Sequence, residues 1–460
     1  MSGAKSTNVC RLGTFCFALL CWAGSDRVPV FAAEYDVGMG YALTRESNIT
    51  RTTAPTSDVT EQLFGGLAYT ENSTELTARL LTQVERRRFV HHVYPDDTGF
   101  FLDGSAVWAI SPRFFTWTLQ DIFQELNTSP TANATPATLQ KTNSLSTGPE
   151  FTFRVNPTDA PVIGARYGKF RIQGVETSVQ SPGDSDRYVL YALWLHQMSA
   201  ASTLSPTIVA TRIHFDPPAL YTSISRNDYF FRYNFIQPNI RQMADVGATR
   251  LAQYGGQDYN GKLLRYMGQW MRTTETALRI FLADQISDTY TDMIQSQDFA
   301  ISALPSMRGE AAAAPLTVTN FAVPDVYHSR LGDLSYTNQT EAFGYGLQAH
   351  LRRVDYANLP QDYTEKGGRF SVSWLFSAEA QAFAYTQYVK RVFDGIDEQD
   401  TDRDMQAGVR YKLGRTLSLT LQAGRIERHS NVPQQSFVDN RAQLILGYST
   451  GPLFTPLPRR

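Results

Sequence analysis

The stretch from Met405 to Gly424 decides the fold class that the sequence predicts. It reads MQAGVRYKL over 405–413, GRT over 414–416 and LSLTLQAG over 417–424. Apolar and polar residues alternate strictly in both arms, as they do in a pleated strand with one apolar and one solvated face. A short glycine-containing turn between two such arms predicts a β-hairpin.

The hairpin pattern recurs along nearly the whole chain. Successive short turns are separated by about 35 to 45 residues, which is enough for two tilted membrane-spanning strands and one longer loop. A propeller or solenoid can show the same period, but each propeller blade needs four short strands, and here there are two long ones. The expected turns lie near 71–73, 111–113, 156–157, 199–200, 238–239, 273–274, 338–339, 378–379 and 414–415.

Longer polar loops are expected between the other strand ends. They fall at 46–58, 91–98, 127–140, 178–186, 216–227, 255–260, 357–368, 395–403 and 430–439, and the longest spans about 287–325. Short turns on one rim and long loops on the other are typical of outer-membrane barrels.

We therefore predict an all-β fold, a transmembrane antiparallel up-and-down β-barrel of about 18–20 strands. The preferred count is 20, but weak alternation over 35–45 and 242–254 leaves 18 open. The alternative is a secreted β-sandwich or solenoid. Aromatic residues near expected strand ends, such as Trp194, Trp270 and Trp374, favour the interfacial girdles of a membrane barrel.

The N-terminus has the features of a secretory signal. Lys5 and Arg11 precede an apolar run over 12–23, and Val30-Phe31-Ala32 offers small residues at the two positions that a signal peptidase recognises. We expect a signal peptide over 1–32, a barrel over 33–450 and a short tail over 451–460. The expected location is the outer membrane of a Gram-negative bacterium.

Cysteine content and charge exclude several classes. Cys10, Cys16 and Cys21 all lie within the expected signal peptide, so the mature chain would have neither disulfides nor thiolate metal sites. No apolar run is long enough for a transmembrane helix. The net charge of −2 gives no reason to expect a nucleic-acid partner.

Several segments resemble large outer-membrane β-barrels that are encoded with bacterial exopolysaccharide and exosortase systems. They are 35–38 (YDVG), the first loop with Asn48, 142–155 with Thr147-Gly148-Pro149, 327–331 (YHSRL) and 352–356 (RRVDY). The resemblance implies a part in exporting or assembling exopolysaccharide at the cell surface. Two features depart from the family pattern: Tyr448 is followed by a Pro-rich tail rather than ending the chain, and no periplasmic domain is visible.

Arginine dominates the cations of this chain. Of the 42 Lys and Arg residues, 35 are Arg, and many lie on expected strands opposite apolar faces. Guanidinium groups bind carboxylate or phosphate in bidentate fashion, so such strands could line a path for an anionic polymer. The competing interpretation is that they pair with Asp and Glu across strands. The candidate pore-lining residues are Arg86, Arg88, Arg154, Arg232, Arg265, Arg279, Arg410 and Lys412.

No enzyme constellation is evident. The seven histidines are scattered, and neither H-E-x-x-H nor a nucleophile elbow is present. Asp400, Asp402 and Asp404 have the alternate spacing of a calcium loop, but Met405 replaces its turn glycine, which favours a solvated surface loop. We expect no catalytic residue, metal or cofactor.

The favoured function is therefore non-catalytic export or surface assembly of exopolysaccharide. The alternatives are a general diffusion porin for small solutes and a barrel enzyme acting on lipid or polysaccharide. The expected partners are outer-membrane lipid and lipopolysaccharide, an anionic exopolysaccharide and other export components. We expect a monomer, because the apolar strand faces show no broad polar gap.

Overall fold

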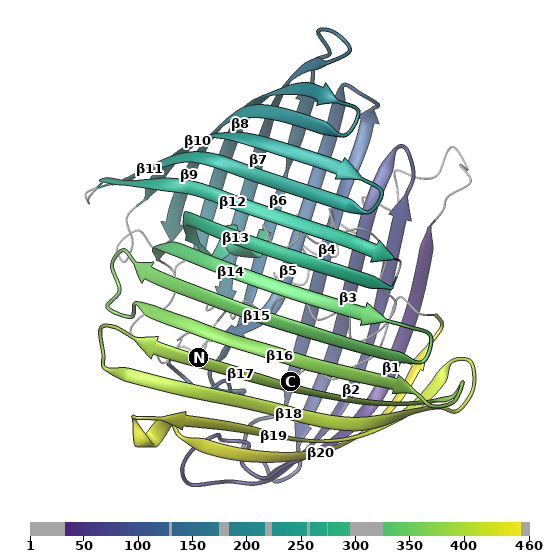
Figure 1. Ribbon diagram of the computed structural model, residues 1–460. Coiled ribbons are helices and arrows are strands. Elements are labelled where there is room, and N and C mark those ends of the chain that lie inside the picture. The colour runs from purple at the N-terminus through teal and green to yellow at the C-terminus, as the bar shows by residue number, and fades with distance from the viewer. Residues whose placement is uncertain are drawn as a thin grey trace, which may run out of the picture.

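The chain forms one closed antiparallel barrel of 20 strands (Figure 1). The computed structural model describes residues 33–127, 131–173, 184–216, 223–254, 258–273, 275–294 and 325–451. The strands are β1 (Glu34–Glu46), β2 (Asp58–Asn72), β3 (Leu76–Phe89), β4 (Asp97–Ser111), β5 (Phe115–Asn127), β6 (Leu139–Thr152), β7 (Asp159–Gln173), β8 (Asp184–Ser199), β9 (Ser202–Asp216), β10 (Ile224–Gln237), β11 (Ile240–Gln253), β12 (Asp258–Thr273), β13 (Thr276–Asp288), β14 (Val326–Gln339), β15 (Phe343–Tyr356), β16 (Tyr363–Leu375), β17 (Ala380–Phe393), β18 (Glu398–Lys412), β19 (Leu417–Ser430) and β20 (Phe437–Ser449).

Each strand pairs with its neighbours in the sequence, and β1 pairs with β20 to close the barrel. This confirms the predicted fold class and settles the strand count at 20, so the weakly alternating 35–45 and 242–254 do form strands. The hairpin quoted first is β18 and β19, with Ala407 directly opposite Ala423.

Side-chain alternation separates an apolar outer face from a polar inner face. On β1 the outer face carries exposed Tyr35, Val37, Met39 and Leu43, whereas Ala42 on the inner face is fully buried. A large exposed apolar surface is unfavourable in water, so this belt is the surface that faces lipid.

The two rims differ as predicted. The nine short turns lie close to their predicted positions, and the strand ends joined by the longer connections lie at the opposite rim. Of the predicted loops, 128–130, 178–183, 217–222, 255–257 and 295–324 lie outside the described residues. β1 begins and β20 ends at the turn rim, where Gly38 pairs with Ser449. The expected signal peptide lies outside the described residues, as does 452–460, nearly all of the expected tail. No helix in the described ranges is long and apolar enough to cross a membrane.

The sheet is interrupted at two places on the loop side. The β4–β5 ladder stops at Leu102 and Phe123, and the β12–β13 ladder stops at Leu264 and Asp284, although the strands continue beyond both points. In the second gap Ile286 packs against the inner side of β9–β11 in a cluster with Ile213, Ile224, Leu251 and Val326. The loop-side end of β13 therefore lies on the lumenal side of β9–β11.

Candidate lumenal site

The segment that follows β13 folds into the barrel. Asp288 accepts two contacts from Arg187 on β8, at 3.0 Å from Nη1 and 2.6 Å from Nη2, and both residues are buried. Four strands, β9–β12, lie between β8 and β13 in the sheet. The pair therefore joins two parts of the wall across the interior.

A helical turn over 289–294 continues this segment along the inner wall. Tyr290 and Met293 pack in a buried cluster with Ile122 of β5 and Phe170 of β7. The Arg187 guanidinium lies 4.2 Å from the centre of the Tyr290 ring, a cation–π contact. The segment is thus fixed to the β5–β8 wall by apolar and charged contacts together.

The same turn is also held by the β14–β15 wall. Asp292 accepts from Arg352 at 3.0 Å and from the Tyr327 hydroxyl at 2.6 Å, and Ser287 also donates to it. Because the segment touches both walls, it narrows the interior at the loop-side end of the barrel.

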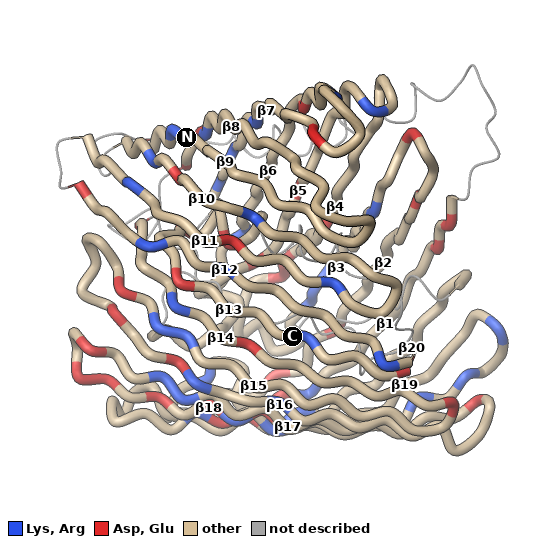
Figure 2. The backbone as a smooth tube through the Cα atoms, turned by 45° about the horizontal axis from the view of Figure 1, so that its top comes forward, with Lys and Arg blue, Asp and Glu red and all other residues tan. Residues whose placement is uncertain are grey.

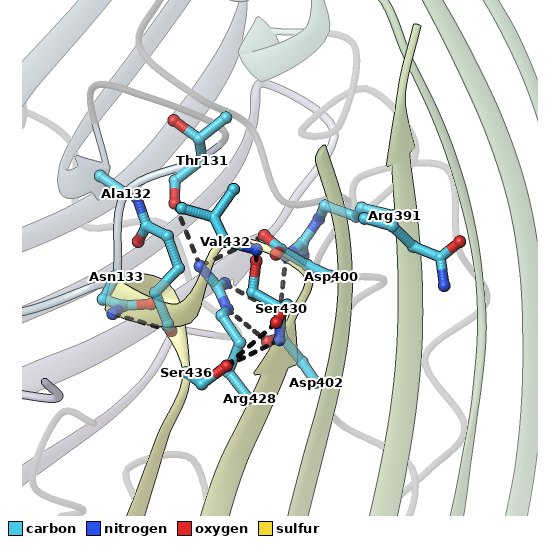
Figure 3. A network of polar contacts seen from close by, with 12 residues as sticks. Thr131, Ala132, Asn133, Arg391, Asp400, Asp402, Arg428, Ser430, Val432 and Ser436 are labelled. Atoms are coloured by element: carbon cyan, nitrogen blue, oxygen red, sulfur yellow. Dashed lines mark hydrogen bonds and ion pairs between the residues drawn. The ribbon is translucent and has the colours of Figure 1, made fainter. Parts of the chain in front are cut away.

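A second inward segment comes from the β5–β6 loop. Arg428 on β19 donates to the Thr131 carbonyl at 3.2 Å, although β20 and β1–β4 separate β19 from β5 (Figure 3). Asn133 donates to the carbonyls of Arg51 at 2.7 Å and Gln435 at 3.3 Å. The loop therefore reaches the first and last loops of the barrel.

Charged pairs on the inner face support this contact. Arg428 binds both oxygens of Asp402, at 2.6 and 2.9 Å, and Arg391 reaches Asp402 at 2.7 Å (Figure 3). Arg391 also donates to Glu365 at 2.5 Å. Asp402 lies on β18 beside buried Asp400. The expected solvated loop is therefore wrong for Asp400, Asp402 and Asp404, because these residues belong to a strand whose inner face is lined by arginines.

Arg51 closes the opening between the first loop and the β5–β6 loop. It donates to the Ala134 carbonyl, and its burial, together with the nearby Arg441 cation, lowers its pKa to about 10. Burial likewise raises the pKa of Tyr94 in the β3–β4 loop. Several loops thus share one desolvated contact region.

Two candidate pore-lining residues share one carboxylate. Arg232 and Arg265 both lie on the inner face, and each contacts fully buried Asp245 at 2.7 Å. Both guanidinium groups also lie 5.4 Å from the Phe230 ring. These contacts fit the competing interpretation, in which lumenal arginines pair across strands.

Three further candidates also lie on the inner face. Arg279 of β13 has no hydrogen bond or ion pair among the described residues. Arg410 donates to Thr420 at 3.4 Å, and Lys412 is exposed at the turn-side end of β18. Their contact with any cargo stays a prediction.

The remaining three candidates do not point into the lumen. Arg86 and Arg88 share the outer face of β3 with exposed Val84, and Arg88 pairs with Glu61 at 3.3 Å on that face. Arg154 lies beyond the end of β6, in the exposed turn before β7. The predicted lumenal orientation is therefore wrong for these three residues.

Sequence reasoning missed the arginines that hold the inward segments, namely Arg187, Arg352, Arg391 and Arg428. Each shares a strand face with buried residues, as Arg352 does with Val354, so their orientation could have been predicted. Asp402 lies directly opposite Arg428, and Glu365 directly opposite Arg391, so these pairs follow from the strand register. The partners of Arg187 and Arg352 could not be predicted, because those contacts join strands to a segment far away in the sequence.

In the described part of the chain, no group of three or more His, Cys, Asp or Glu residues is placed to hold a metal ion. The charged clusters instead join strands and loops through ion pairs.

Residues 369–448, from the middle of β16 to the end of β20, match the family model described as "Putative beta-barrel porin 2". Together with the closed 20-stranded barrel, this match confirms the resemblance to outer-membrane β-barrels and supports a porin-like barrel. It does not address an association with exopolysaccharide. No curated protein matches the chain.

Similar solved structures are large barrels. They include Pseudomonas aeruginosa OccK7 (OpdD), with 9% identity, 91% of this chain and 98% of that chain covered, and a TM-score of 0.35. Acinetobacter baumannii OccAB4 has 9% identity, the same shares covered and a TM-score of 0.38. A mutant of the P. aeruginosa ferric enterobactin receptor (PfeA) has 10% identity, 91% and 81% covered, and a TM-score of 0.45.

Proposed function

We propose that this porin-like outer-membrane barrel passes an anionic exopolysaccharide outward through its lumen, without catalysis. The observation that carries the proposal is the pair of inward segments, 131–134 and 288–294, which lie against arginine-bearing walls. A narrowed, cationic passage suits an extended polyanion because each repeating carboxylate finds a guanidinium group along its route.

Diffusion of small solutes is the second candidate. It is favoured by the pairing of Arg232, Arg265, Arg391 and Arg428 with carboxylates, which leaves less free positive charge to attract a polyanion. The two functions make different demands: a polymer needs a continuous row of binding groups, whereas a small ion needs only an open, hydrated path.

The absence of catalysis and the monomeric state are part of the proposal. The inner-face clusters described above join walls and loops through ion pairs and hydrogen bonds, which supports a structural role for them. The apolar belt continues around the outer face, which fits a single barrel surrounded by lipid.

Single-channel conductance in planar bilayers tests the proposal. We expect open steps that an acidic polysaccharide blocks from one side, and little block by a neutral dextran of equal size. Replacing Arg279 with Gln should shorten each blocking event, because this inner-face guanidinium has no partner in the described structure.

The control is Arg272→Gln, which changes an exposed outer-face arginine at the turn end of β12. Equal block by acidic and neutral polymers would refute polyanion transport and favour the diffusion porin. Hydrolysis of either polymer by the purified barrel would refute the non-catalytic role.

A further inference from the structure

The outer face carries a band of cations at its loop-side edge. On β1 the apolar outer residues end at Leu43 and are followed by Arg45, one residue before the strand ends. Five of the six described lysines, all but Lys412, also lie on outer faces near the loop rim. In Figure 2 much of the charge on β11–β17 lies toward the loop-side ends of these strands.

Many of these cations lack a bonded side-chain partner among the described residues. Within the described residues, eight of them make no side-chain hydrogen bond, ion pair or ring contact. They are Arg45, Arg86, Lys169, Arg212, Lys262, Arg330, Lys366 and Lys390. Isolated surface cations are common, but a band of them directly above a lipid-facing belt lies where it can attract the anionic headgroups of the adjacent leaflet.

Two adjacent strand pairs place like charges directly opposite each other. Lys366 of β16 faces Lys390 of β17, and Arg330 of β14 faces Arg353 of β15. Arg353 has Asp355 at 2.9 Å as a partner, whereas the two lysines have none in the described structure. Directly opposed like charges destabilise a sheet unless an anion lies between them.

An apolar crevice opens within the same band. It has a volume of about 460 Å³ and lies where β12 and β13 separate. Its lining includes Tyr259, Ile286 and Val326, with Lys262 and Arg330 beside them. Two carboxylates also line it, and each has its own partner: Asp284 pairs with His328 and Asp355 with Arg353. Gly261 has no side chain at the point where Ile286 packs, and a Cβ there would lie 2.9 Å from the Ile286 Cδ1 atom.

We propose that the outer face of β12–β17 at the loop rim binds a phosphorylated, acylated glycolipid of the outer leaflet. Its phosphates would lie on Lys262, Arg330, Lys366 and Lys390, and one acyl chain would occupy the crevice. Cations beside an apolar cavity at the membrane edge match both halves of such a lipid. This site does not depend on what passes through the lumen.

Binding of bisphosphorylated, hexa-acylated lipid A to the refolded barrel in detergent tests the proposal. The lipid should bind wild-type protein more tightly than the same lipid after its phosphates have been removed. Replacing Arg330, Lys366 and Lys390 with Gln should weaken binding by about fivefold per charge, and on the order of a hundredfold for the triple variant. Arg272→Gln, on the outer face at the turn rim, should bind like wild type.

Heat-modifiable migration on gels verifies that each variant is folded, and the comparison of the two lipids needs no variant. Equal binding of phosphorylated and dephosphorylated lipid A would overturn the proposal, and so would an unchanged triple variant. Full displacement by millimolar inorganic phosphate would show a simple anion site. Displacement by acidic polysaccharide alone would show a polymer-docking surface. Either result would also overturn the glycolipid assignment.

Discussion

Replacing Asp288 with Asn should release the segment over 288–294 from the β5–β8 wall. Asp288 and Arg187 are both buried, so the change leaves a buried guanidinium without its counter-charge. Breaking such a pair costs about 3–5 kcal/mol. At about 1.4 kcal/mol for each factor of ten, the equilibrium between docked and undocked segment should shift by a hundredfold to a few thousandfold.

Single-channel recording is the assay, because the segment narrows the lumen. The Asp288→Asn channel should show larger conductance and added open-state noise. Replacing Arg187 with Met in the same protein should reverse part of the effect, since no buried charge then remains unpaired.

The matched control is Asp258→Asn. Asp258 pairs with Arg250 at 3.4 Å on the exposed outer face, where a pair contributes about 0–1 kcal/mol. Conductance and noise in Asp288→Asn that equal those of this control would refute the inward segment as a constriction.

Three further predictions concern the free energy of unfolding and the ion selectivity of the channel. Replacing Asp245 with Asn should leave Arg232 and Arg265 on the inner face without their shared carboxylate. The reversal potential in a salt gradient should then move toward anion selectivity, and an unchanged reversal potential would contradict the prediction. Replacing Arg166 with Met should lower the free energy of unfolding in urea by about 1.5–3 kcal/mol. The reason is that the Arg166 guanidinium donates to the carbonyls of Gly148 and Pro149, where the β6–β7 ladder is broken. A variant as stable as the wild type would refute this role. Burial raises the pKa of Asp325, a loop residue, above its ordinary 3.8. The protonated carboxyl therefore contributes stability that is present below pH 3.8 and is lost as the pH rises through the raised pKa. Asp325→Asn should remove this pH dependence from urea midpoints measured between pH 3.5 and 7, and identical profiles for the variant and the wild type would contradict the prediction.

The strand pattern was predictable because the lipid imposes it residue by residue. Each strand must present apolar groups outward, so the alternation over 405–424 in one hairpin is enough to predict the fold class. The same constraint could have corrected the prediction that Arg86 and Arg88 point into the lumen. Val84 is apolar and two residues before Arg86, so both side chains lie on the lipid side of β3.

The candidate site was less predictable because its contacts are not local. Arg428 on β19 contacts Thr131 in the β5–β6 loop, although five strands lie between β19 and β5, and Arg187 contacts Asp288, although four strands lie between β8 and β13. Periodicity assigns a side chain to a face but does not choose its partner. Tyr327 and Arg352 were noticed only in segments that resemble a family, and they proved to hold the inward turn.

Arginine on the inner wall has a consequence for how the passage responds to acidity. Guanidinium groups stay protonated at any pH that the protein survives, so the positive charge of the passage is fixed. Carboxylates, in contrast, are the groups that acid neutralises. Acidification therefore changes the lumenal potential in one direction only, toward stronger attraction of anions.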